Sequence, residues 1–105
     1  MVDGATPLGE LQYRQRALVV GRVRSISVQP WSGVSVLECT LVDDTGALRV
    51  VFLGRRSIAG IEPGVVLQVE GMVGRHGGRL AMINPRYDIV LPGSAVGDAT
   101  GTAAS

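Results

Sequence analysis

The chain has 105 residues, 46% of them hydrophobic, and a formal net charge of +1, which together indicate one globular domain with a modest core. No apolar run reaches the length of about 18 residues that a membrane-spanning helix needs, and we expect no secretory signal in the first residues. One cysteine and one histidine are too few for an internal disulfide or a zinc site, so we expect a cytoplasmic protein without metal or cofactor.

The charges are unevenly distributed along the chain. All ten basic residues are arginines, and residues 14–88 hold these ten against six acidic residues, so this part carries a net charge of +4. The absence of lysine is most simply explained by codon usage in a GC-rich genome. Each arginine nevertheless offers planar, bidentate hydrogen bonding to any phosphate that it meets.

The two ends of the chain differ from its middle. Residues 1–16 begin with a stretch of glycine, alanine, threonine and proline and continue as LGELQYRQRA, which predicts a tail that leads into a short helix or an extended segment. Residues 92–105 are small, polar and nearly uncharged, and they predict a disordered C-terminal tail. Residues 17–91 therefore form the expected domain.

The middle of the chain predicts five strands, because valine and isoleucine are frequent and apolar residues alternate with polar ones. The predicted strands are residues 17–28, 34–42, 47–53, 65–73 and 79–90. The last is broken at Asn84-Pro85, since proline cannot donate to the ladder. Residues 54–61, GRRSIAGI, break the alternation and predict a short helical segment between the third and fourth strands.

The stretch LVDDTGALRVVFL predicts a tight hairpin between the second and third strands. Gly46 ends the turn, because glycine can take a positive φ without strain. Alternation turns Leu48 and Phe52 toward the core and leaves Arg49 facing outward. Aspartates favour turns, so we expect Asp43 to stabilise the hairpin rather than to bind a metal.

This order of elements predicts an all-β protein with the OB-fold, a five-stranded Greek-key barrel. Closure of the barrel removes the exposed edges that valine-rich strands would otherwise present to other chains. Another small five-stranded barrel, such as an SH3-like one, is the rival architecture. The helical segment expected after the third strand favours the OB-fold.

Three motifs resemble those of the nucleic-acid-binding OB domains: VVGRVRSI, LVDDTGALRVVFLG and IEPGVVLQVEGMV. They are similar to the GxV, LxDxxGxLxVVF and PGxxVxVxGxV patterns of the anticodon-binding domains of class II aminoacyl-tRNA synthetases and of the wedge domain of the RecG-type DNA helicase. LGRRSIAGIEPG and NPRYDIV look like segments of short stand-alone actinobacterial OB-fold proteins that bind nucleic acid. The resemblance implies a binding module, since no synthetase or helicase catalytic module accompanies it.

The resemblance places the binding surface on the second and third strands, framed by the loops between strands one and two and between strands four and five. Outward arginines there would contact phosphates, and a loop tryptophan would stack on a base. The candidate nucleic-acid-binding residues are Arg22, Arg24, Trp31, Arg49, Arg75 and Arg79.

Each candidate also has a plainer interpretation. Outward arginines on a strand commonly form a solvated face, and Trp31 can instead cover one end of the barrel. Arg49 can pair with Glu38 on the neighbouring strand, which would reduce its attraction for phosphate. The anticodon-binding domains usually have an aromatic residue where Glu38 stands and a glutamine where Arg49 stands. We therefore expect weak, salt-dependent binding to the backbone instead of base readout.

Two functions stand open at this point. The first is a non-catalytic module with low sequence specificity that binds single-stranded or structured DNA or RNA. The second is a module for protein–protein interaction or homo-oligomerisation, which is favoured by the low net charge, by Glu38 and by three valines expected on the surface, Val34, Val36 and Val51. We do not expect an enzyme, because no phosphate-binding loop, metal cluster or nucleophile–base pair is recognisable.

Overall fold

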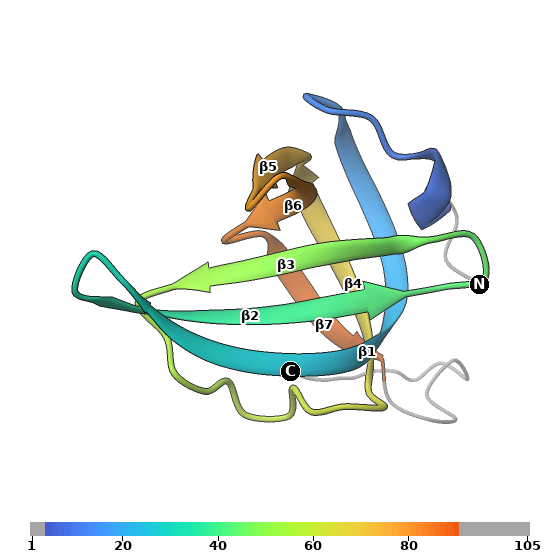
Figure 1. The fold of residues 1–105 in the computed structure, drawn as a ribbon. Helices are drawn as coiled ribbons and strands as arrows, with labels where there is room; N and C mark the ends of the chain where they lie inside the picture. Colours follow the sequence, from blue (N-terminus) through green and yellow to red (C-terminus); the bar gives the residue numbers. More distant parts are fainter. Residues whose placement is uncertain (1–3, 91–105) are drawn as a thin grey trace.

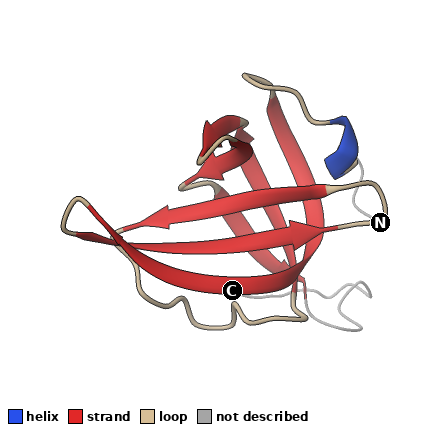
Figure 2. Cartoon of the chain, viewed as in Figure 1, coloured by secondary structure: helices blue, strands red, loops and turns tan. Residues whose placement is uncertain are grey.

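The computed structural model describes residues 4–90, which form one curled, seven-stranded sheet preceded by a 3-10 turn (Figure 1). The elements are η1 (Leu8–Glu10), β1 (Arg16–Trp31), β2 (Val34–Val42), β3 (Ala47–Leu53), β4 (Val66–Met72), β5 (Gly74–His76), β6 (Arg79–Ile83) and β7 (Arg86–Val90). Strands dominate the fold in Figure 2, which confirms the predicted all-β class. The tail predicted at residues 92–105 lies outside the described residues. Among the described residues, no helix is long and apolar enough to span a bilayer.

The sheet has the strand order β5-β6-β3-β2-β1-β4-β7, in which β3 and β6 are parallel and the other neighbours are antiparallel. The long β1 serves two partners, since its first half pairs with β4 and its second half with β2. The change falls at Arg22, which is in register with both Val42 and Val66. A bulge follows between Val23 and Ser25. Because a bulge bends a strand and increases its twist, β1 can curve around the sheet as Figure 1 shows.

The predicted number of five strands is not confirmed, because one predicted strand is divided and one short strand forms outside the predicted ones. The strand expected at residues 65–73 becomes β4, which ends where the N–H of Val73 donates to the carbonyl of Gln15 at 2.7 Å, and β5 forms beyond it, outside the predicted strands. The strand expected at residues 79–90 becomes β6 and β7, with the predicted break before Pro85. The two edge strands, β5 and β7, therefore belong to a single hairpin whose arms are β4–β5 and β6–β7.

The predicted helical segment between β3 and β4 is absent, and residues 54–65 form consecutive turns. Gly60 and Gly64 take φ values of 86° and 96°, in the left-handed region that an α-helix excludes. Ile58 and Ile61 from this segment are nevertheless buried in the main core. The turns therefore close one end of the core, below the sheet in Figure 1, without helical hydrogen bonds.

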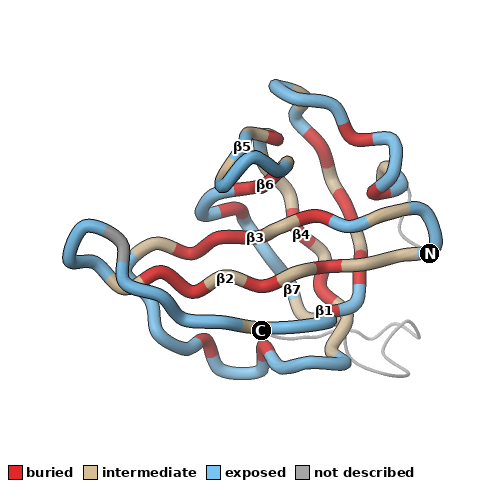
Figure 3. Tube along the Cα trace, viewed as in Figure 1, coloured by how far each residue is buried: buried red, intermediate tan, exposed pale blue. Residues whose placement is uncertain are grey.

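The core confirms the alternation predicted for the central strands. The residues expected on the inner face of β2 and β3 are Leu37, Cys39, Leu41, Leu48, Val50 and Phe52, and all of them lie in the main buried cluster. Figure 3 shows buried positions recurring along both strands. Burial, and then the neighbouring charge of Glu38, raises the pKa of the Cys39 thiol to about 11, so the thiol stays protonated near neutral pH.

The segment before β1 packs against the turn between β2 and β3. Leu8 and Leu11 are buried in the main core. The N–H of Leu8 donates to Oδ2 of Asp43 at 2.9 Å, and the N–H of Gly9 donates to the hydroxyl of Thr45 at 2.8 Å. The segment expected to be a tail or a short helix therefore contributes a 3-10 turn and two core side chains.

Asp43 organises the turn between β2 and β3, as predicted. Its Oδ1 accepts hydrogen bonds from the N–H and the hydroxyl of Thr45, both at 2.7 Å, and from the N–H of Gly46 at 3.0 Å. Partial burial acts to raise the pKa of this carboxyl, but these bonds and the bond from Leu8 hold the pKa below its ordinary value. Gly46 is required for a different reason than predicted. Its φ is not positive, and a Cβ there would lie 2.9 Å from Cα of Gly9.

Candidate nucleic-acid interface

The outer surface of β1, β2, β3 and β6 is the surface on which the sequence placed the binding site. Since the core fixes which residues point inward, the alternate positions on these strands point outward. The register aligns two cross-strand rows, and we call these eight residues the outer face: Ser25, Thr40, Arg49 and Ala81 in one row, and Ser27, Glu38, Val51 and Ile83 in the next.

Arg49 is engaged on two sides within this face. Its Nε forms an ion pair with Oε2 of Glu38 at 2.5 Å, and its Nη1 donates to the carbonyl of His76 at 3.1 Å. The side chains of Arg49 and Glu38 are only 23% and 17% exposed. The pairing that the sequence left open is therefore present. Arg49 ties β2 and β3 to the hairpin between β5 and β6, and part of its positive charge is already neutralised.

Part of the outer side of the sheet is apolar and buried. Val36, Val51 and Ala81 form a second buried cluster outside the main core, with Leu53 packed against it. The expectation that Val36 and Val51 are exposed is wrong, because the parallel pairing of β6 with β3 brings a further strand alongside them. The expected exposure of Val34 is confirmed.

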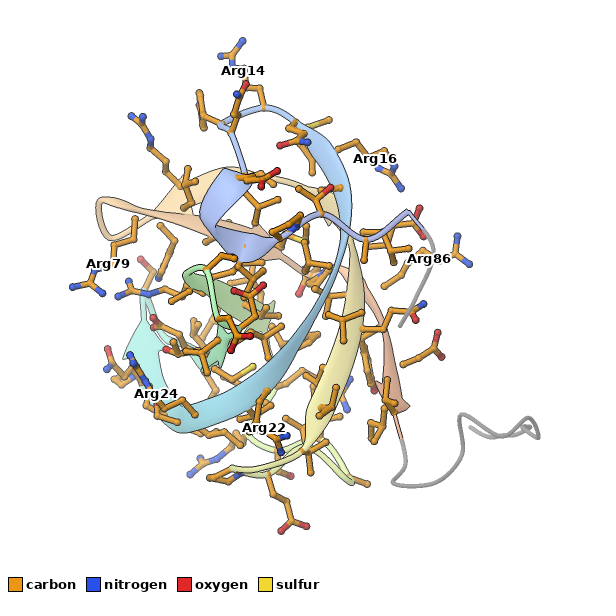
Figure 4. All side chains as sticks on the ribbon, turned by 90° about the vertical axis from the view of Figure 1, so that its right-hand side faces the viewer. Arg14, Arg16, Arg22, Arg24, Arg79 and Arg86 are labelled. Atoms are coloured by element: carbon orange, nitrogen blue, oxygen red, sulfur yellow. The ribbon has the colours of Figure 1, made fainter. Side chains whose placement is uncertain are left out.

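Arg24 and Arg79 border the outer face. Arg24 lies at the bulge of β1, and Arg79 begins β6, two residues before Ala81 and therefore on the same side of that strand. Figure 4 shows both side chains pointing away from the ribbon on the same side of the molecule. Both residues are exposed, and neither has a hydrogen-bond or ion-pair partner among residues 4–90.

Arg22 and Trp31 are placed differently from these two. Arg22 lies on β1 close to Arg24, but its Nη1 donates to the carbonyl of Gly64 at 2.8 Å. Trp31 is the last residue of β1 and is in register with Val34 at the tip of the β1–β2 hairpin, which projects beyond the rest of the sheet in Figure 1. The structure describes the backbone of Trp31 and not its side chain.

Arg75 lies on β5 and faces a residue that the sequence did not single out. Its guanidinium carbon is 4.7 Å from the centre of the Tyr13 ring, and that of Arg14 is 5.4 Å from the same ring. Tyr13 had no visible signal in the sequence, because residues 1–16 show no strand periodicity and its partner Arg75 lies far away in the sequence. Arg49 therefore lies within the outer face and Arg24 and Arg79 at its borders, whereas Arg22 is engaged by Gly64 and Arg75 by Tyr13.

The described residues hold little else that resembles a site for chemistry. No group of three or more histidine, cysteine, aspartate or glutamate residues in the described part of the chain is arranged to hold a metal ion. A shallow open depression on β4 and β7, of about 60 Å³, is lined by Gln68, Glu70, Arg86, Tyr87 and Asp88. This volume holds a few water molecules and not a substrate.

Comparison with solved structures agrees with this architecture. The chain is similar to the replication factor A related protein from Methanobacterium thermoautotrophicum, with a TM-score of 0.64 and 22% identity over 84% of this chain and 92% of that one. It is also similar to the OB domain of Ta0387 from Thermoplasma acidophilum, with a TM-score of 0.65 and 18% identity over 82% and 86% of the two chains. No family model and no curated protein matches the sequence. At these identities the likeness establishes the OB-fold. The resemblance to synthetase, helicase and actinobacterial proteins stays a prediction.

Proposed function

We propose that the protein is a non-catalytic module that binds single-stranded or structured nucleic acid through the phosphate backbone, with low sequence specificity. The observation that carries this proposal is an OB-fold whose outer face is bordered by two exposed arginines, Arg24 and Arg79, that have no hydrogen-bond or ion-pair partner among the described residues. Such a guanidinium can bind a phosphate without first breaking an internal bond. The name of the replication factor A related protein favours a nucleic-acid ligand as well.

The composition of the outer face supports a backbone-directed mode of binding. Between the two arginines it offers the hydroxyls of Ser25, Ser27 and Thr40, which can hydrogen-bond to phosphate and sugar oxygens. No aromatic side chain belongs to the eight residues of the outer face. Stacking is therefore assigned to positions beside it, with Trp31 at the tip of the β1–β2 hairpin as one candidate. Contacts to phosphates position a strand without reading its bases, so low specificity follows.

The proposal is tested by fluorescence anisotropy with a labelled oligothymidine of about 12 nucleotides, a length within the range that one OB-fold covers. Titrations from about 50 to about 200 mM salt give both the affinity and its salt dependence. We expect Arg24→Gln and Arg79→Gln each to weaken binding and to reduce the slope of log K against log salt by about 0.7, the loss of one phosphate contact.

The matched control is Arg86→Gln, which removes the same charge from β7, where the side chain points to a different side of the molecule in Figure 4. Its salt slope should equal that of the wild type. If the wild-type protein binds neither the single strand nor a DNA or RNA hairpin at the lowest salt, the proposal is wrong. If all three variants weaken binding equally, attraction is general and the outer face is not the interface.

A second candidate function, self-association or docking of a protein, is favoured by exposed apolar side chains. Ile83 on the outer face and Val34 on the β1–β2 hairpin are both exposed. Sedimentation velocity over a range of protein concentrations measures the solution mass. A stable dimer that is disrupted by Ile83→Asp, together with no binding of nucleic acid, would favour this second function over the first.

A further inference from the structure

Tyr13, Arg14 and Arg75 form a compact aromatic and cationic cluster beside the barrel, separate from the outer face. Tyr13 is 47% exposed, and both guanidinium groups lie against its ring. Arg14 comes from the turn before β1 and Arg75 from β5, so the cluster joins segments that are far apart in the sequence. Figure 4 shows Arg14 at the top of the molecule, beyond the start of β1.

The cluster carries two positive charges, and no carboxylate within residues 4–90 pairs with either of them. A cation over the face of an aromatic ring is favourable, but a second cation at the same ring repels the first. An anion placed between the two guanidinium groups would remove this repulsion, so the arrangement is suited to a negatively charged ligand.

The backbone around Arg14 is held in an unusual conformation. Arg14 has a φ of 70°, in the left-handed region where glycine or asparagine is normally found and a long side chain is uncommon. The N–H of Arg14 donates to the carbonyl of Val73 at 2.7 Å, and the N–H of Gln12 donates to Oε1 of Gln15 at 2.9 Å. The turn is therefore fixed to the end of β4, and it keeps an arginine where glycine would be less strained.

We propose that Tyr13, Arg14 and Arg75 bind one nucleotide of a single-stranded nucleic acid, with its base stacked on Tyr13 and its phosphate between the two guanidinium groups. The phenol ring, which is 47% exposed, supplies the stacking surface when a guanidinium group that lies over it turns to the phosphate. The arginines supply the charge-assisted hydrogen bonds to the phosphate oxygens.

This proposal rests on the proposed function and extends it along the surface. The β5–β6 hairpin connects the two regions, since Arg75 faces Tyr13 while the next residue, His76, accepts the hydrogen bond from Arg49. A strand that follows the outer face past Arg79 and over this hairpin reaches Tyr13. The barrel then has a stacking position, which the outer face itself does not supply.

The test compares two probes of equal length, an oligothymidine and an oligomer of the same sugar–phosphate backbone with abasic sites in place of bases. Tyr13→Leu removes the stacking surface but no charge, so it should weaken oligothymidine binding at least about fivefold and leave the abasic probe unchanged. Arg75→Gln should weaken both probes and reduce the salt slope by about 0.7. Arg86→Gln is again the control of equal charge. The exposure of Tyr13 favours retention of the fold, which the thermal midpoint of each variant checks.

The possible outcomes separate this proposal from the one on which it rests. If the wild type binds oligothymidine and Tyr13→Leu changes neither probe, or weakens both equally, the stacking site is wrong while the module still binds nucleic acid. If the wild type binds neither probe at the lowest salt, the proposed function fails and this inference fails with it.

Discussion

Replacing Glu38 with glutamine should strengthen the binding of nucleic acid. The carboxylate of Glu38 holds Nε of Arg49 in the middle of the outer face and places a negative charge where the proposed function requires phosphate. Glutamine has nearly the same shape and retains an oxygen that can accept the hydrogen bond from Nε. Glu38→Gln therefore removes the charge and retains the geometry.

The expected gain follows from the repulsion that the substitution removes. A phosphate bound at Arg49 would lie roughly 7 Å from the Glu38 carboxylate, and at an effective dielectric constant of about 40 to 80 the repulsion is about 0.6–1.2 kcal/mol. This energy corresponds to about a three- to eightfold higher affinity at low salt. Because the ion pair is partly exposed, its loss should lower the free energy of unfolding by less than about 1 kcal/mol.

The assay is the salt titration of labelled oligothymidine, with Glu70→Gln on β4 as the matched loss of one acidic charge. Glu38→Gln should increase the salt slope by up to about 0.7, as one more phosphate is engaged, whereas Glu70→Gln should leave it unchanged. In the double variant Glu38→Gln/Arg49→Gln the gain should disappear. Unchanged affinity and slope in Glu38→Gln, in a protein whose wild type binds, would refute the role given to Arg49.

Three further predictions concern the fold that supports this surface. Asp43→Ala removes the acceptor of four hydrogen bonds and should lower the free energy of unfolding in urea by about 2–4 kcal/mol. Folding lowers the pKa of Asp43, so the ionised carboxylate stabilises the folded protein fully above about pH 4, and this stabilisation is lost as the pH falls through the folded pKa. Over that pH range the free energy of unfolding of the wild type should therefore fall more steeply than that of Asp43→Ala. Gly9→Ala places a Cβ against the backbone carbonyl of Thr45 and should destabilise by about 1–3 kcal/mol, whereas Gly74→Ala, whose Cβ has ordinary contacts, should change thermal stability less. The Cys39 thiol, with its pKa raised to about 11, should react with a thiol reagent at pH 8 at least about tenfold more slowly in the folded than in the urea-unfolded protein.

The sequence predicts the two central strands well because their side chains alternate with a period of two. From Leu37 in β2 to Phe52 in β3 every inner strand position is apolar, and the period alone assigns these residues to the core. The break before Pro85 follows from the missing N–H of proline. The apolar residues of the segment between β3 and β4, Ile58 and Ile61, have helical spacing, but glycines with positive φ determine its backbone.

Other features depend on partners that are distant in the sequence. Leu8 enters the core because its N–H donates a hydrogen bond to Asp43, 35 residues further on. No local periodicity in the sequence predicts this contact. Val51 looks like an outward residue by alternation, yet it is buried because β6 pairs in parallel beside it. Local patterns specify which side of a strand a residue faces, whereas tertiary pairing decides whether that side is covered.

The same distinction applies to the arginines of the candidate interface. Alternation correctly predicts that Arg49 lies on the outer face. Its guanidinium is nevertheless not fully available to a phosphate, because Glu38 and the carbonyl of His76 already occupy two of its donors. The guanidinium groups without a hydrogen-bond or ion-pair partner in the described part of the chain include those at irregular positions, the bulge at Arg24 and the start of β6 at Arg79. A bulge and a hairpin end direct side chains away from the ladder, where neighbouring strands offer no carboxylate. The proposed phosphate contacts, Arg24 and Arg79, therefore lie at the borders of the outer face. Between these two arginines a bound nucleic-acid strand meets the Glu38–Arg49 pair, which determines the net charge at the centre of the face.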